Sequence, residues 1–112
     1  MVTIEDDGTQ TATVGVEHEL FVSSDAKVFT LIVDANEMVN GDNLVLRVYG
    51  IVISTGAERV VFEATYAHIQ AEPIKVSIPF PSPGHTDGYR VTLNQSAGSG
   101  GRDFDWSVVS TG

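Results

Sequence analysis

The sequence predicts an all-β domain, a small antiparallel β-sandwich of about eight strands. Apolar and polar residues alternate with a period of two through most of the chain, which is typical of half-buried strands. Glycine, proline, asparagine and aspartate interrupt these runs, and almost no segment has the apolar spacing of a helix. With 112 residues the chain has the size of one domain. Two packed sheets are the favoured arrangement, and a jelly roll is one form they can take.

The first third of the chain contains three predicted strands. Thr9–Val14 and Val16–Val22 are short alternating runs on either side of Gly15, so we expect them to pair with each other. Val28–Ala35 is a third run with the same alternation. The polar stretch Asn36–Asn43 then predicts a loop.

The strongest local signal is a β-hairpin in the middle of the chain. Leu44–Ile53 and Arg59–Ile69 are rich in valine, isoleucine, tyrosine, phenylalanine and threonine, which favour strands. The segment Ser54–Glu58 joins them, and Gly56 suits the turn.

Three further strands are predicted after the hairpin. Between Ile74 and Phe80 every second residue is apolar, so this strand should turn an apolar row towards the core. Pro79 cannot donate a ladder hydrogen bond and therefore places it at a sheet edge. Beyond the turn-rich loop Pro81–Gly88, two more strands carry the next alternating rows, separated by Ala97–Gly101, which we expect to be flexible. The rows are Tyr89, Val91 and Leu93, and then Phe104, Trp106 and Val108.

The predicted hairpin is apolar on both faces, whereas a sandwich strand is usually polar on its outer face. One explanation is a central strand covered by another part of the same chain. The other is a subunit interface, since large apolar patches tend to mark partner surfaces. The candidate interface residues are Val45, Tyr49, Ile51, Ile53, Val61 and Ile69.

The composition restricts the classes of partner. The formal net charge of −9 disfavours nucleic acid and anionic membrane surfaces. No apolar run approaches the roughly 20 residues that span a bilayer, and the N-terminus does not read as a signal peptide, so synthesis in a cytoplasm is expected. Without cysteine, thiol catalysis and thiolate metal sites are excluded. We expect residues 1–8 to form an acidic arm and residues 9–112 the sandwich domain.

No catalytic, metal or cofactor site is predicted. His18, His68 and His85 have no zinc-site spacing, and Ser99 lies among glycines and not in a nucleophile elbow. The segment from Asp34 to Asp42 fails the EF-hand pattern. A looser calcium site from Asp34, Asn36, Asp42 or the Glu5–Asp7 cluster is an alternative, but turn formers and a solvated N-terminus explain these acids better. The aromatic residues could make a sugar platform, although core positions explain them better. They are Tyr49, Tyr66, Tyr89 and Trp106.

Several stretches together resemble small virion proteins of tailed bacteriophages, over about three-quarters of the chain from Thr30 onward. These stretches are Leu44–Gly50, Glu63–Tyr66, Gln70–Lys75, Ser77–Pro79, Val91–Gln95 and Ala97–Trp106. The resemblance implies a non-enzymatic capsid decoration (cement) protein, made in the host bacterial cytoplasm and located on the capsid exterior. Its implied partners are the major capsid protein and further copies of itself, with a trimer favoured. A tail, neck or spike component and a carbohydrate-binding β-sandwich module are the alternatives.

Overall fold

A computed structural model describes residues 1–111, and these form nine strands and no helix. The strands are β1 (Thr3–Thr11), β2 (Glu17–Ser23), β3 (Val28–Asp34), β4 (Asn43–Gly50), β5 (Arg59–Ala67), β6 (Ile74–Val76), β7 (Phe80–Pro81), β8 (Tyr89–Ala97) and β9 (Asp103–Thr111).

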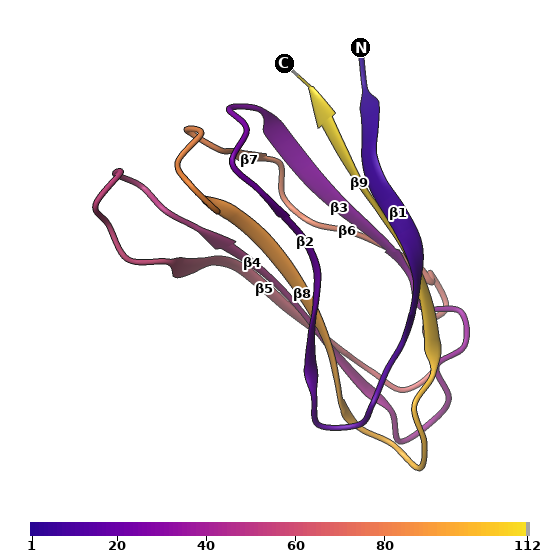
Figure 1. Cartoon of the computed structure of the whole chain (residues 1–112). Coiled ribbons are helices and arrows are strands. Elements are labelled where there is room, and N and C mark those ends of the chain that lie inside the picture. Colours follow the sequence, from indigo (N-terminus) through magenta and orange to yellow (C-terminus); the bar gives the residue numbers. More distant parts are fainter. Residues whose placement is uncertain (112) are drawn as a thin grey trace.

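The strands form two antiparallel sheets that face each other (Figure 1). The five-stranded sheet has the order β1-β9-β3-β6, with β7 also paired to β3, and the four-stranded sheet has the order β2-β8-β4-β5. If β6 and β7 are counted as one interrupted strand, eight strands follow the order of a jelly roll. The predicted fold class is therefore confirmed.

The expected pairing around Gly15 is wrong. β1 pairs with β9 and β2 pairs with β8, so the two strands belong to different sheets. The linker between them crosses from one sheet to the other, and Gly15 there has a φ of 86°, which glycine adopts without strain. The expected acidic arm is not separate from the sandwich, since Thr3–Gly8 are part of β1 and pair with β9.

The core lies between the sheets and uses the apolar rows that the alternation predicted. Tyr89, Val91 and Leu93 of β8 are fully buried, and so are Phe104 and Val108 of β9. The other rows come from β3 (Phe29, Leu31, Val33) and β4 (Leu44, Leu46, Val48). The rings of Phe29 and Tyr89 stack with centroids 4.4 Å apart.

The predicted hairpin is confirmed as β4 and β5, but its strands are shorter than expected. β4 ends at Gly50, where the ring of Phe80 packs on the backbone: a Cβ at that position would lie 2.5 Å from Phe80 Cζ. Ile51, Val52 and Ile53 consequently belong to the loop, and Val52 and Ile53 are exposed.

The predicted inward row after Ile74 is the main error in the fold prediction. Ser77 points inward and is buried, while Ile74, Val76 and Ile78 are 54%, 55% and 46% exposed. Ser77 Oγ accepts a hydrogen bond of 2.9 Å from the backbone N–H of Leu31, and thus occupies a place that a ladder carbonyl would have. Because neighbouring side chains alternate, this position of Ser77 turns the apolar residues outward. The predicted edge location is confirmed, since β6 and β7 both pair only with β3.

The glycine-rich connector between β8 and β9, expected to be flexible, is pinned by side chains. Gln95 is fully buried, donates to Gly100 O (2.9 Å) and accepts from Arg102 N–H (2.8 Å). Arg102 Nε donates to the buried carboxylate of Asp42 at 2.9 Å. Burial alone would raise the pKa of Asp42, but the hydrogen bonds from Arg102 and from Val39 N–H lower it below its ordinary value.

Candidate functional site

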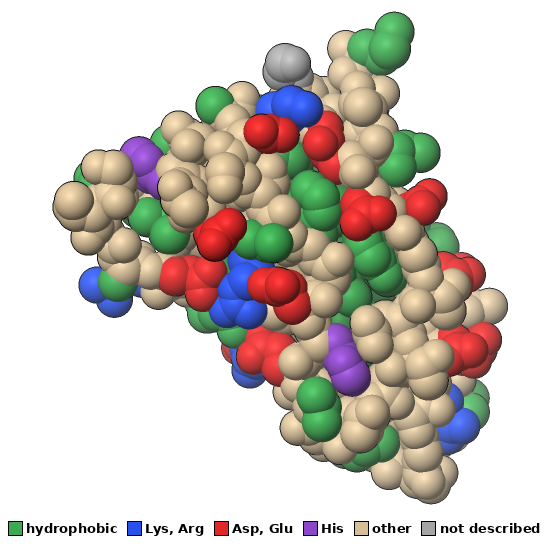
Figure 2. All heavy atoms as spheres, viewed as in Figure 1, with side chains coloured by type: hydrophobic (Ala, Val, Ile, Leu, Met, Phe, Trp, Pro, Cys, Tyr) green, Lys and Arg blue, Asp and Glu red, His purple; other side chains and the backbone are tan. Residues whose placement is uncertain are grey.

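The outer face of the four-stranded sheet carries a connected set of ion pairs and hydrogen bonds. Arg47 of β4 lies between Glu63 of β5 (Nε to Oε1, 2.5 Å) and Glu17 of β2 (Nη1 to Oε2, 3.4 Å). Arg90 of β8 makes a two-pronged contact with Glu58, at 2.7 and 3.1 Å. Figure 2 shows basic side chains in contact with acidic ones over β4 and β8. This face is thus covered by its own polar side chains.

Glu17 is the centre of this polar face. Its Oε2 accepts hydrogen bonds from the hydroxyls of Thr92 and Tyr49, the latter at 2.6 Å. Burial opposes ionisation of Glu17, but the bonds from Thr92, Tyr49 and Arg47 outweigh it and lower its pKa. Burial and the neighbouring Glu17 raise the pKa of Tyr49, whose ring lies 4.1 Å beneath the Arg90 guanidinium.

The six predicted interface residues are not brought together in one patch. Val45 is almost buried and Tyr49 lies under Arg90, both on the outer face. Val61 packs against the core. Ile51 and Ile53 are in the hairpin loop, and Ile69 is exposed just beyond β5.

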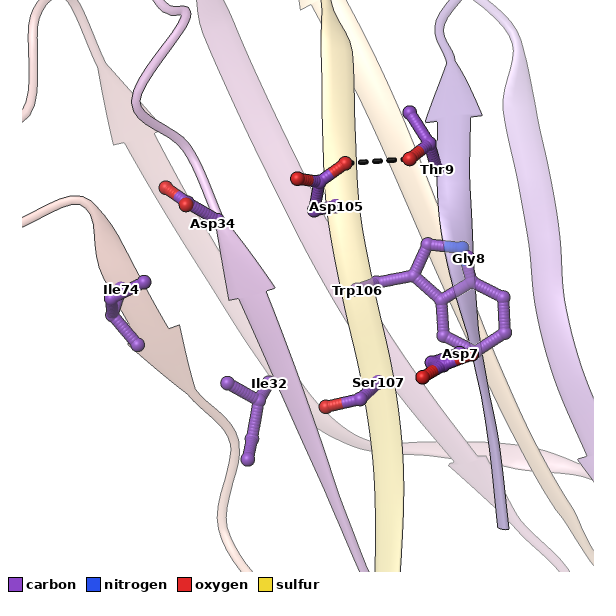
Figure 3. Close-up of a pocket in the computed structure, with 9 residues that line it drawn as sticks. All are labelled: Asp7, Gly8, Thr9, Ile32, Asp34, Ile74, Asp105, Trp106 and Ser107. Atoms are coloured by element: carbon purple, nitrogen blue, oxygen red, sulfur yellow. Dashed lines mark hydrogen bonds between the residues drawn. The ribbon is translucent and has the colours of Figure 1, made fainter. Parts of the chain in front are cut away.

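The five-stranded sheet has a different outer face, with a shallow hollow of about 460 Å³ (Figure 3). Its rim carries three carboxylates, Asp7 of β1, Asp34 of β3 and Asp105 of β9, and among residues 1–111 no lysine or arginine lines it. Asp34 and Asp105 are direct cross-strand partners, and Thr9 Oγ1 donates to Asp105 at 2.6 Å. The hollow is therefore an anionic surface without a cation of its own.

An apolar edge adjoins this hollow. Ile74 lines the hollow opposite Asp34, and Val76 pairs with Ile32, which also lines it. Together with Ile78, these outward residues of the interrupted edge form what we call the β6 apolar stripe (Ile74, Val76 and Ile78). Sequence reasoning missed this surface because the alternation was interpreted with the wrong face inward.

The histidines have structural roles in turns and loops. His18 Nε2 accepts from Thr13 N–H (3.0 Å), His68 Nδ1 accepts from Gly41 N–H (2.9 Å), and His85 Nε2 lies 3.1 Å from Val52 O. Within residues 1–111 no group of three or more histidine, aspartate or glutamate side chains is arranged to hold a metal ion. The same residues contain no helix that could cross a membrane.

The structure does not bring the four aromatic residues of the sugar-platform alternative together on one face, and Tyr49 lies under Arg90. Tyr89 is fully inside the core, and its hydroxyl has no hydrogen-bond partner among the described residues. Trp106 packs against the core, and its indole extends over Gly8 (Figure 3). Tyr66 lies beneath the Lys75 ammonium, 4.7 Å from the ring centroid. The predicted core position of Tyr89 is thus confirmed.

No protein family matches the sequence, and no curated protein does so either. Among solved structures, the chain is similar to one chain of the structure of the infectious bursal disease virus Gx strain, with a TM-score of 0.42 and 18% sequence identity. The alignment covers 99% of this chain and 31% of that chain, so this chain spans about a third of the viral chain's length. A likeness of this size assigns neither a family nor a function.

Proposed function

We propose that the protein is a non-enzymatic structural component of a virion, a decoration protein that binds the outer surface of a phage head. The observation that carries the proposal is the β6 apolar stripe. An isolated sandwich gains stability when the apolar residues of an edge strand face its core. Here three of them face solvent while Ser77 and Lys75 occupy the inner positions, which is what a contact surface requires.

The fold and the sequence agree with this proposal. Jelly rolls recur in viral capsid proteins, which is an argument from fold analogy. The resemblance to small phage virion proteins includes Gln70–Lys75 and Ser77–Pro79, and these segments contain Ile74 and Ile78, two of the three residues of the stripe. The partner is the major capsid protein, which would cover the stripe and reach the neighbouring hollow. Because the hollow is anionic, the matching capsid surface should combine apolar and basic side chains.

The test is binding to heads that lack the protein. The purified chain should co-sediment with such heads and raise the temperature at which they release DNA. The double variant Ile74→Ser/Val76→Ser should fold normally, since both residues are more than half exposed, but it should lose at least tenfold in head affinity.

A matched control comes from the opposite side of the sandwich. Val16→Ser/Val22→Ser removes two valines that are 43% and 39% exposed, and it should bind like the wild type. Failure of the wild type to bind or protect heads would overturn the proposal. If Ile74→Ser/Val76→Ser binds heads as well as the wild type does, the β6 apolar stripe is not the contact surface.

A further inference from the structure

The two sheets have four edges, and three of them are poor templates for another strand. β1 is bulged between Ile4 and Asp6 and carries three successive acids, and β2 is bulged between Glu19 and Phe21. The β6–β7 edge is interrupted and contains Pro79 and Pro81. Bulges, charges, prolines and short edge strands all hinder pairing between molecules.

The fourth edge, β5, is built differently. It has nine residues without proline or lysine. Its bulge is at Val61, near the start of the strand, and from Phe62 to Ala67 its register with β4 is unbroken. Its residues Val61, Phe62, Thr65 and Tyr66 favour strands. By its sequence, β5 is the edge most able to accept a further strand.

The direction of the β5 main-chain groups follows from the end of the strand. His68 N–H donates to Asp42 O at 2.9 Å, just beyond the β4 ladder, so the preceding carbonyl, Ala67 O, points away from β4. That carbonyl accepts from Gln70 Nε2 at 2.8 Å. Alternation along the strand then turns the N–H and C=O groups of Glu63 and Thr65 to the free edge. Within residues 1–111 these groups have no hydrogen bond outside the sheet ladder.

The core is also open along β5. Phe62, Ala64 and Tyr66 point between the sheets but are only partly buried. Their direct partners on β4, Val48, Leu46 and Leu44, are at most 2% exposed. One face of the Tyr66 ring lies beneath the Lys75 ammonium. A strand added beside β5 would further bury Phe62 and Tyr66, and this burial would add to the main-chain hydrogen bonds.

We propose that the occupant of this edge is β5 of a second copy, antiparallel and related by a two-fold axis through Ala64. In this register Phe62 lies opposite the second copy's Tyr66, and Glu63 lies opposite the second copy's Thr65. The Glu63–Thr65 pairs occur on both sides of the axis and give about four main-chain hydrogen bonds. The four-stranded sheet of one copy and that of the second copy then become one continuous sheet.

The sequence of β5 selects a second copy and this register. An axis through Glu63 would place two glutamates directly opposite each other, which is destabilising. An axis through Thr65 would pair Glu63 with Ala67, whose carbonyl already accepts from Gln70. Among these three registers, the axis through Ala64 is the one that pairs aromatic residues and opposes no like charges. Such a contact closes with two copies, so it replaces the three-fold arrangement that the phage resemblance implies.

Light scattering on the full chain, without capsids, tests this proposal separately from the proposed function. The chain of 12.0 kDa should form a species of twice that mass as its concentration rises. Thr65→Pro removes one N–H at the free edge and none that faces β4, so the variant should fold and remain monomeric. Thr65→Val keeps the N–H and should dimerise like the wild type.

A cross-link provides a second test that does not depend on the proline variant folding. The chain has no cysteine, and Ala64 would face its own symmetry copy, so Ala64→Cys should form an intermolecular disulfide under mild oxidation. Ala57→Cys, in the exposed hairpin loop, should not. A wild type that stays monomeric, a trimer, a dimer unaffected by Thr65→Pro, or no preferential cross-link at Ala64 would each overturn the proposal.

Discussion

The outer faces of the two sheets differ in how far their charged and apolar side chains are paired within the chain. On the four-stranded sheet, Arg47 and Arg90 are each placed between acids of other elements, and the Arg90 guanidinium lies over the Tyr49 ring of β4. On the five-stranded sheet, Asp34 lies opposite Asp105 with no cation in the hollow, and isoleucines face solvent beside them. The first face is complete within one chain, whereas the second has both charge and apolar surface left for a partner.

Charge reversal at Arg47 should have the largest effect on stability. Arg47→Glu would place an acid between Glu17 and Glu63, and it removes two ionic contacts that are partly screened by solvent. We expect a loss of about 2 kcal/mol in the free energy of unfolding, measured by urea denaturation. Arg59→Glu is the control, because Arg59 on the same hairpin is exposed and makes no ion pair within residues 1–111, and its effect should stay below about 0.5 kcal/mol.

The acid sensitivity of the four-stranded sheet should be the next largest effect. The pKa of Glu17 is lowered from 4.5, so its contribution to stability is complete above that pH and is lost as the pH falls through the folded-state value. Glu17→Gln should therefore reduce the loss of stability below about pH 4.5 in urea titrations across pH. The loss should not disappear, because the pKa values of Glu5 and Asp42 are also lowered.

The control for this titration is Glu37→Gln, in an exposed turn where the carboxylate makes no hydrogen bond within residues 1–111. It should leave the pH profile unchanged. Identical profiles for Glu17→Gln and the wild type would show that Glu17 does not organise the face as described.

The smallest effect is expected on the five-stranded sheet. Asp105→Asn removes the like charge opposite Asp34 and keeps an acceptor for Thr9, so stability should rise by about 0.5 kcal/mol and the gain should shrink in high salt. Asp103→Asn is a close control, because Asp103 accepts from Thr11 in the same way, at 2.6 Å, and has no acid opposite it on β3. Equal effects of the two variants would contradict repulsion between Asp34 and Asp105.

Much of the fold, but little of the candidate site, could be predicted from local patterns. The rows on β8 and β9 and the central hairpin were found because each is long and strictly alternating. The β6 apolar stripe was not predicted, because alternation divides the residues of a strand between two faces but does not indicate which face points to the core. A single buried hydroxyl, that of Ser77 bonded to Leu31 N–H, decided that question. The structure does not bring the predicted interface residues into one patch, because Tyr49 contacts Glu17 and Arg90, which are distant in the sequence, and Val45 is buried.

The sequence by itself determined the all-β class, the hairpin and most of the core, because these depend on periodicity and turn residues within short segments. Tertiary structure alone decided that β1 and β2 lie in different sheets, that β4 is covered by ion pairs, and that β6 faces outward. The reason is that strand partners and registers are selected by long-range hydrogen bonds and packing, and a shift of one residue exchanges the two faces of a strand.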